Sequence, residues 1–163
     1  MMDFQIKRTG RRCHETDREL KPGETFYSEL VDEEGELTRR DLSSEAWDGP
    51  HENSIGWWQA KVPDIQGGKV YWAPRDILLS YFESLQQHEQ HRAAAYVMAL
   101  LLVRKRILKL VDSIEHDGIE CLEVRYAKDN KTWNVPVVEL KNEQAESIQQ
   151  ELAQQLFTDH PPE

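Results

Sequence analysis

The stretch AAAYVMALLLV, residues 93–103, has no charged or strongly polar side chain, and it decides how the rest of the chain is expected to pack. A helix on a protein surface shows polar residues on its outward face, so this run predicts a helix that is buried on all sides. It is too short to cross a membrane, which takes roughly 20 apolar residues. We therefore expect Leu100→Asp or Leu101→Asp to unfold the protein, because an unpaired buried carboxylate costs several kcal/mol. If this helix is exposed instead, the run from Ala93 to Val103 is expected to be an association face that forms a homodimer.

The chain before this helix is expected to be rich in β-strands and loops. Phe4 and Ile6 alternate with polar neighbours and indicate a short first strand. Runs of aromatic and aliphatic residues between turn residues indicate further strands, and apolar residues with helical spacing indicate a helix after them. The predicted strands span residues 25–31, 37–42, 56–62 and 69–72, and the predicted helix spans residues 74–87.

Three strands of an antiparallel meander are expected after the apolar helix. Leu108, Leu110 and Ile114 are predicted to share one face of the first strand, and an Asp-Gly pair after it is a hairpin signal. The next two strands show apolar alternation at Leu122, Val124 and Tyr126 and at Trp133, Val135 and Val137. Pro136 lacks a backbone N–H, so the third strand is predicted to lie at an edge of the sheet.

The chain is expected to end in an amphipathic helix. Asn142 is predicted to be its N-cap, because its side-chain oxygen can accept a hydrogen bond from an otherwise unsatisfied N–H. The apolar stripe of this helix consists of Ala145, Ile148, Leu152 and Leu156.

These elements predict an α+β protein with a β-rich N-terminal part, two central helices of which one is fully apolar, a three-stranded antiparallel meander and a C-terminal amphipathic helix. Residues 1–72 are expected to form a β-rich subdomain that contains tryptophans. Residues 73–157 are expected to form a helix-helix-βββ-helix subdomain, and residues 158–163 a flexible tail.

Composition limits the function classes. The chain of 163 residues has 20 Lys and Arg against 30 Asp and Glu, a formal net charge of -10, which argues against a nucleic-acid partner. The basic run at residues 104–109 suggests such a partner, but cations at a helix end are favoured by the helix dipole alone. No segment has the pattern of a signal peptide or a membrane span, so we expect a cytoplasmic protein with no membrane contact.

Cys13 and His14 are the neighbouring residues that suggest catalysis or metal binding. A structural zinc site takes four ligands at paired spacings, and a second pair is missing. A thiol nucleophile needs a base and an orienting carboxylate nearby in space. The other cysteine, Cys121, falls in a predicted strand and is expected to be an ordinary buried side chain. We expect no catalytic residue, no metal and no cofactor, and the alternative is a metal- or thiol-dependent enzyme around Cys13 and His14.

Four tryptophans in the β-rich part are the candidate residues for binding a ligand or partner: Trp47, Trp57, Trp58 and Trp72. Adjacent residues of a strand point to opposite faces, so one of Trp57 and Trp58 is expected to be exposed. An exposed tryptophan among loops is typical of a surface that binds a protein or peptide. The competing interpretation is that the four rings form the core of a small β unit. We expect a non-enzymatic binding protein.

The string GWWQAKV, followed by GGKVYWAP, resembles the end of an SH3 domain. This resemblance covers residues 56–77 and implies that Trp57 and Pro74 line a groove for proline-rich peptides. No SH3-like opening precedes it, and a helix is predicted after Pro74, so an SH3-like peptide-binding module is an alternative.

A second resemblance spans nearly the whole chain. It rests on C-x-x-T-x-R-x-L-x-P-G-E-x-F-Y-S at residues 13–28, R-R-D at 39–41, E-A-W-x-G-P at 45–50 and G-x-W at 56–58, and it continues in AYVMALLLVRKR and WNVPVVEL. These residues resemble an uncharacterised bacterial protein family to which no activity is assigned. The resemblance implies one fold over this length and implies no catalytic residues.

Overall fold

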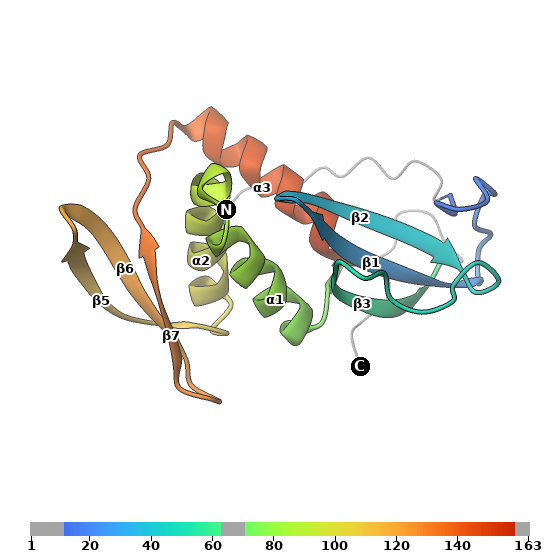
Figure 1. Cartoon of the computed structure of the whole chain (residues 1–163), viewed down its shortest axis with the longest axis horizontal. Helices are drawn as coiled ribbons and strands as arrows, with labels where there is room; N and C mark the ends of the chain where they lie inside the picture. The colour runs from blue at the N-terminus through green and yellow to red at the C-terminus, as the bar shows by residue number, and fades with distance from the viewer. Residues whose placement is uncertain (1–11, 63–70, 159–163) are drawn as a thin grey trace. The chain divides into compact units, whose positions relative to one another are not determined.

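A computed structural model describes residues 12–62 and 71–158, and Figure 1 shows the course of the chain. The fold is α+β, as predicted, with three α-helices and three antiparallel sheets among the described residues. The elements are β1 (Thr25–Glu33), β2 (Glu36–Ser43), β3 (Ser54–Lys61), β4 (Tyr71–Trp72), α1 (Arg75–Gln86), the 3-10 helix η1 (Glu89–His91), α2 (Arg92–Arg104), β5 (Lys109–His116), β6 (Ile119–Tyr126), β7 (Lys131–Pro136), α3 (Asn142–Leu156) and β8 (Phe157–Thr158). The strand predicted at Phe4 and Ile6 lies outside the described residues.

The described residues form two compact units. The first unit contains the residues up to Tyr81 and those from Ala153 onward, and the second is Phe82–Leu152. Each unit has its own three-stranded antiparallel sheet. No described helix is both long enough and apolar enough to cross a membrane.

The sheet of the first unit has the order β2-β1-β3, with β1 in the centre (Figure 1). The β1–β2 hairpin turns at Glu34 and Gly35, whose φ angles of 52° and 90° suit a two-residue turn where the sequence predicts one. Gly56 of β3 lies close to α1, because a Cβ at this position would be 2.5 Å from Cδ1 of Ile77. The face of the sheet that forms the core carries Phe26, Ser28, Leu30, Trp58 and Ala60.

Arg39 joins β2 to the C-terminal end of α3. Its guanidinium donates to the carbonyl of Gln154 at 3.0 Å and also to that of Phe157. The last carbonyls of a helix have no partner within the helix, and the helix dipole favours a cation there. The same guanidinium pairs with Asp41 at 3.2 Å and lies 5.2 Å from the centre of the Trp58 ring. One half-buried cation therefore links the sheet, its core face and the end of α3.

The strands β4 and β8 form a two-stranded pairing in the first unit. Tyr71 pairs with Thr158, and the rings of Trp72 and Phe157 meet edge to face with centroids 4.3 Å apart. Thr158 is buried, so the flexible tail predicted from this residue onward does not begin here. Residues 159–163 lie outside the described residues.

The second unit contains the predicted meander, in the order β5-β6-β7. In the part described, β7 pairs with β6 alone and ends in a proline, which confirms the predicted edge position. The prediction that Leu110 and Ile114 share a strand face is wrong. Leu110 pairs with Val124 and Ile114 with Cys121, three residues apart on β6, so the two side chains point to opposite faces. A β-bulge between them inserts one residue and reverses the alternation.

The helix α2 is not buried on all sides, so this prediction is wrong. One side of the helix carries the buried residues Ala95, Val97, Met98, Ala99 and Leu102. Leu100, however, is 43% exposed, and Leu101 is half-buried. A groove lies between the exposed side of α2 and the chain that follows β7, and Leu100 is one of the residues that line this groove. Leu100→Asp is therefore no longer expected to unfold the protein.

The prediction that Asn142 is the N-cap of α3 is wrong. Lys141 is the N-cap, and Asn142 is the first residue of the helix. The carbonyl of Lys141 accepts the first helical hydrogen bond, from the N–H of Ala145 at 3.0 Å. Its own N–H donates to the side chain of Gln144 at 3.1 Å. The side chain of Gln144, at the third helical position, thus accepts a hydrogen bond from the backbone N–H of the N-cap residue, which is one half of a capping box.

Candidate functional site

Three aromatic side chains meet on the second face of the β2-β1-β3 sheet, which also carries the buried residues Glu29, Val31 and Leu42. Tyr27 belongs to β1, Trp57 to β3 and Trp47 to the loop between β2 and β3. The rings of Tyr27 and Trp47 stack with centroids 4.9 Å apart and planes 7° apart. The Trp57 ring lies 5.4 Å from that of Trp47 and 5.9 Å from that of Tyr27. We call these three residues the aromatic surface.

The strand register places two of these rings on one face. Glu29 pairs with Trp57 across the strands, and Tyr27 precedes Glu29 by two residues, so the three side chains point to the same side. Their neighbours Phe26 and Trp58 point to the opposite side and are buried in the core. The alternation that builds the core therefore also builds the aromatic surface.

The aromatic surface is only partly covered by the rest of the protein. Trp57 is 44% exposed, and Tyr27 and Trp47 are half-buried. A turn after β2 fixes the backbone of Trp47, whose N–H donates to the carbonyl of Ser43 at 3.0 Å. The rings are thus held by contact with one another and by one turn, and they leave an apolar face accessible to solvent.

The structure separates the four tryptophans proposed from the sequence. Trp47 and Trp57 lie together in the aromatic surface. Trp58 is 6% exposed and belongs to the core, and Trp72 packs in the β4–β8 pairing. Tyr27 is a third member of the site that is not among the residues predicted from the sequence. Its signal was the alternation of the predicted strand at residues 25–31, in which Tyr27 must face away from its buried neighbour.

Glu29 is a fully buried carboxylate next to the aromatic surface. Its Oε2 accepts a hydrogen bond from the backbone N–H of His51 at 2.9 Å, and its Oε1 lies 3.9 Å from the guanidinium of Arg40. Among the described residues, no hydrogen-bond donor reaches Oε1. A buried carboxylate is costly unless it is paired, so the hydrogen bond from His51 holds the loop that carries Trp47 against β1.

The loop that carries Trp47 presents negative charge to solvent. Glu45, Asp48 and Glu52 are all exposed within five residues of Trp47. Lys61, at the end of β3, is an exposed cation on the same face of the sheet as the aromatic surface. The loop next to the rings therefore carries three exposed carboxylates, of which Glu45 interacts with the Arg18 guanidinium.

Cys13 is a buried thiol beside the end of β2. Burial raises the pKa of this thiol, but hydrogen bonds with Ser43 and Thr16 outweigh it and lower the pKa to about 6. The N–H of Ser43 donates to Sγ at 3.4 Å. His14 is exposed, and its backbone N–H donates to the carbonyl of Asp41 at 2.8 Å.

Cys13 and His14 are not brought together as a nucleophile and a base. No hydrogen bond joins the imidazole to the thiol in the described part of the chain. Over the same residues, no group of three or more His, Cys, Asp and Glu could hold a metal ion. The low pKa of Cys13 is explained by its hydrogen bonds to Ser43 at the end of β2 and to Thr16 in the turn that follows Cys13.

Comparison of the chain with models of protein families, with curated proteins and with solved structures finds no match.

Proposed function

We propose that this protein is a non-enzymatic binding protein that recognises a protein or peptide partner through the aromatic surface. The observation that carries the proposal is the mutual contact of the three rings of the aromatic surface, with Trp57 44% exposed. Exposed aromatic clusters supply a large contact area at a low cost in side-chain entropy. Tryptophan and tyrosine are accordingly enriched among the residues that dominate binding energy.

We propose further that the partner presents a cationic side chain to these rings. The face of an aromatic ring attracts a cation, and tryptophan does so most strongly. Arginine is favoured because its planar guanidinium also stacks on aromatic rings. The exposed carboxylates of Glu45, Asp48 and Glu52 support this preference, because they add attraction for a basic segment as it approaches.

The alternatives from the sequence make different predictions. An SH3-like groove formed by Trp57 and Pro74 would select proline-rich peptides that need no basic residue. A thiol-dependent enzyme would depend on Cys13 and not on Trp57. We expect the binding protein to act in the cytoplasm, where Cys13 and Cys121 would stay reduced.

Selection of peptides from a random display library on the purified full chain tests the proposal. We expect the selected peptides to be enriched in arginine and lysine. Their Kd, measured by calorimetry, is expected to rise at least tenfold for Trp57→Ala, since a central aromatic residue is worth about 2 kcal/mol or more. Trp57 is already half-exposed, so the variant is expected to fold, and a thermal melt checks this.

Leu110→Ala is the matched control. Leu110 is 47% exposed, so it is an apolar side chain of similar exposure that belongs to the second unit. We expect the selected peptides to bind this variant as tightly as the wild type. Peptides that bind Trp57→Ala as well as the wild type contradict the proposal, as does a selection that enriches no peptide. Proline-rich peptides without a cation would favour the SH3-like alternative.

A further inference from the structure

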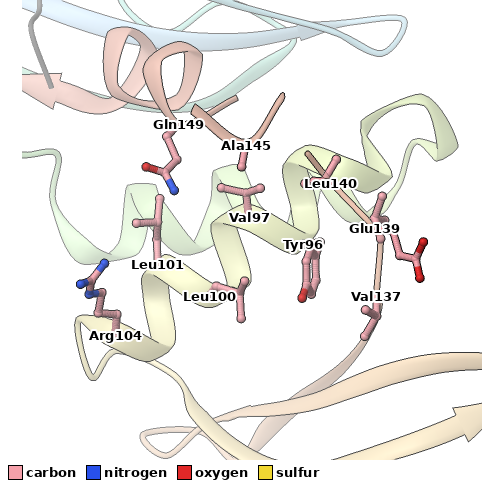
Figure 2. A pocket seen from close by; sticks show the side chains of 11 residues that line it. Tyr96, Val97, Leu100, Leu101, Arg104, Val137, Glu139, Leu140, Ala145 and Gln149 are labelled. Carbon is pink, nitrogen blue, oxygen red and sulfur yellow. The ribbon is translucent and has the colours of Figure 1, made fainter. Parts of the chain in front are cut away.

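A groove in the second unit is lined by the exposed side of α2. It has a volume of about 710 Å³ and is bounded by α2, the segment that follows β7 and the first turns of α3 (Figure 2). Its apolar lining includes Tyr96 and Leu100 of α2 and Val137 and Leu140 of the segment. Tyr96 and Leu100 are one helical turn apart and project side by side. The groove plays no part in the aromatic surface, which belongs to the first unit.

Two charged residues line this groove, Arg104 and Glu139, and Figure 2 shows them at its opposite ends. Arg104 lies four residues after Leu100 and so continues the same stripe of α2. Among the residues that the structure describes, neither Arg104 nor Glu139 forms an ion pair. The groove thus presents an apolar centre, a cation at one end and an anion at the other, and both charges are available to a partner.

We infer that this groove is the contact surface of a homodimer, and that its occupant is a second copy of this chain. In a two-fold symmetric contact, residue i of one copy meets residue j of the other, and j meets i. Opposite charges at the two ends of the groove are therefore complementary to those of a second copy after a two-fold rotation. Arg104 of each copy pairs with Glu139 of the other, and Leu100 of both copies is buried at the centre.

Sedimentation equilibrium over a series of concentrations measures this association. We expect the wild-type chain to dimerise, and Leu100→Asp to raise the Kd of the dimer at least tenfold, because it places two carboxylates at an apolar centre. Leu100 is 43% exposed in the single chain, so the variant is expected to keep the wild-type circular dichroism spectrum and a cooperative melt.

Charge exchange tests the pairing itself. Arg104→Glu alone sets glutamate against glutamate in both symmetric contacts, and Glu139→Arg alone sets arginine against arginine. Each single variant is therefore expected to self-associate at least tenfold more weakly than the wild type. An equimolar mixture of the two is expected to form a heterodimer, because each contact then joins a glutamate to an arginine. As a control, Arg92→Glu and Glu115→Arg, both exposed and outside the groove, are expected to leave the dimer unchanged.

A wild-type chain that remains monomeric at about 1 mM overturns the inference, since even a weak specific dimer is populated there. A dimer that survives Leu100→Asp and both charge reversals also overturns it, because such a dimer uses another surface. The same holds if the mixture of Arg104→Glu and Glu139→Arg associates no better than either variant alone. If Leu100→Asp fails to fold, the charge exchange decides the question by itself.

Discussion

Replacing Arg39 with methionine is expected to lower the free energy of unfolding by about 3–5 kcal/mol, a large part of the stability of a protein of this size. The side chain of Arg39 is 11% exposed and that of Asp41 is 18% exposed, so their ion pair is shielded from solvent. Removing one partner of a buried pair is costly because the remaining carboxylate then lies beside an apolar group.

The hydrogen bonds of Arg39 to the end of α3 add to this cost. Its guanidinium donates to the carbonyls of Gln154 and Phe157, and each lost hydrogen bond costs about 1 kcal/mol. Methionine keeps an unbranched apolar side chain near Trp58, so the loss of stability in this variant comes mainly from the missing polar contacts. We also expect faster hydrogen exchange at the amides of β8, because the carbonyl of Phe157 in this strand accepts one of these hydrogen bonds.

Urea unfolding, followed by tryptophan fluorescence, measures the change from the shift of the midpoint at a constant slope. Arg92→Met is the matched control, because Arg92 is 44% exposed and pairs with an exposed Glu89 at 3.6 Å. Its expected cost is below about 0.5 kcal/mol. The free energy of unfolding of Arg39→Met is not expected to fall by less than about 1 kcal/mol, or by no more than that of the control. Either result would refute the claim that Arg39 connects β2 to the end of α3.

Further predictions concern burial and pH. Leu102→Asp is expected to unfold the protein, because Leu102 is fully buried, whereas Leu100→Asp keeps a cooperative thermal transition. Stability is expected to rise from pH 6 to pH 9, because the fold holds the pKa of Cys13 at about 6 against an ordinary value of 9.0, and thermal melts of Cys13→Ala are expected to lose this dependence. Stability is expected to fall as the pH drops from 4.5 to 2, because the hydrogen bond from Arg18 lowers the pKa of Glu24 to about 2, and melts of Glu24→Gln are expected to show a smaller fall. A stable Leu102→Asp variant would contradict the first expectation. A wild-type dependence of stability on pH in Cys13→Ala or in Glu24→Gln would contradict the other two.

Elements with a clear period in the sequence could be predicted. The β1–β2 hairpin follows from apolar alternation on either side of a turn that needs positive φ at Glu34 and Gly35. Helical spacing predicts the buried side of α1, where Ile77, Leu78 and Phe82 are indeed buried. Such local patterns need no knowledge of what the element packs against.

Features that depend on distant parts of the chain could not be predicted. The bulge between Leu110 and Ile114 is set by pairing with β6, and no local residue marks it. The exposure of Leu100 depends on where the chain runs after β7 and not on the composition of α2. Arg39 reaches a carbonyl 115 residues further along, a contact that only the folded chain creates.

The candidate site was predictable in part. The sequence predicts Trp47 and Trp57 as site residues, because large aromatic residues in loops and strands are typical of binding surfaces. Their contact with Tyr27 depends on the register between β1 and β3 and on the turn after β2, which composition does not determine. The buried position of Trp58 follows once one face of β3 is known to form the core.

The proposed function is tested most directly by NMR of the tryptophan indole N–H groups, because the five tryptophans report separately on the two units. On titration with a selected arginine-containing peptide, the signals of Trp47 and Trp57 are expected to shift together and to saturate at the Kd measured by calorimetry. The signals of Trp58, Trp72 and Trp133 are expected to stay in place. A peptide that binds without moving Trp47 and Trp57, or that shifts Trp133 instead, would show that the aromatic surface is not the binding site.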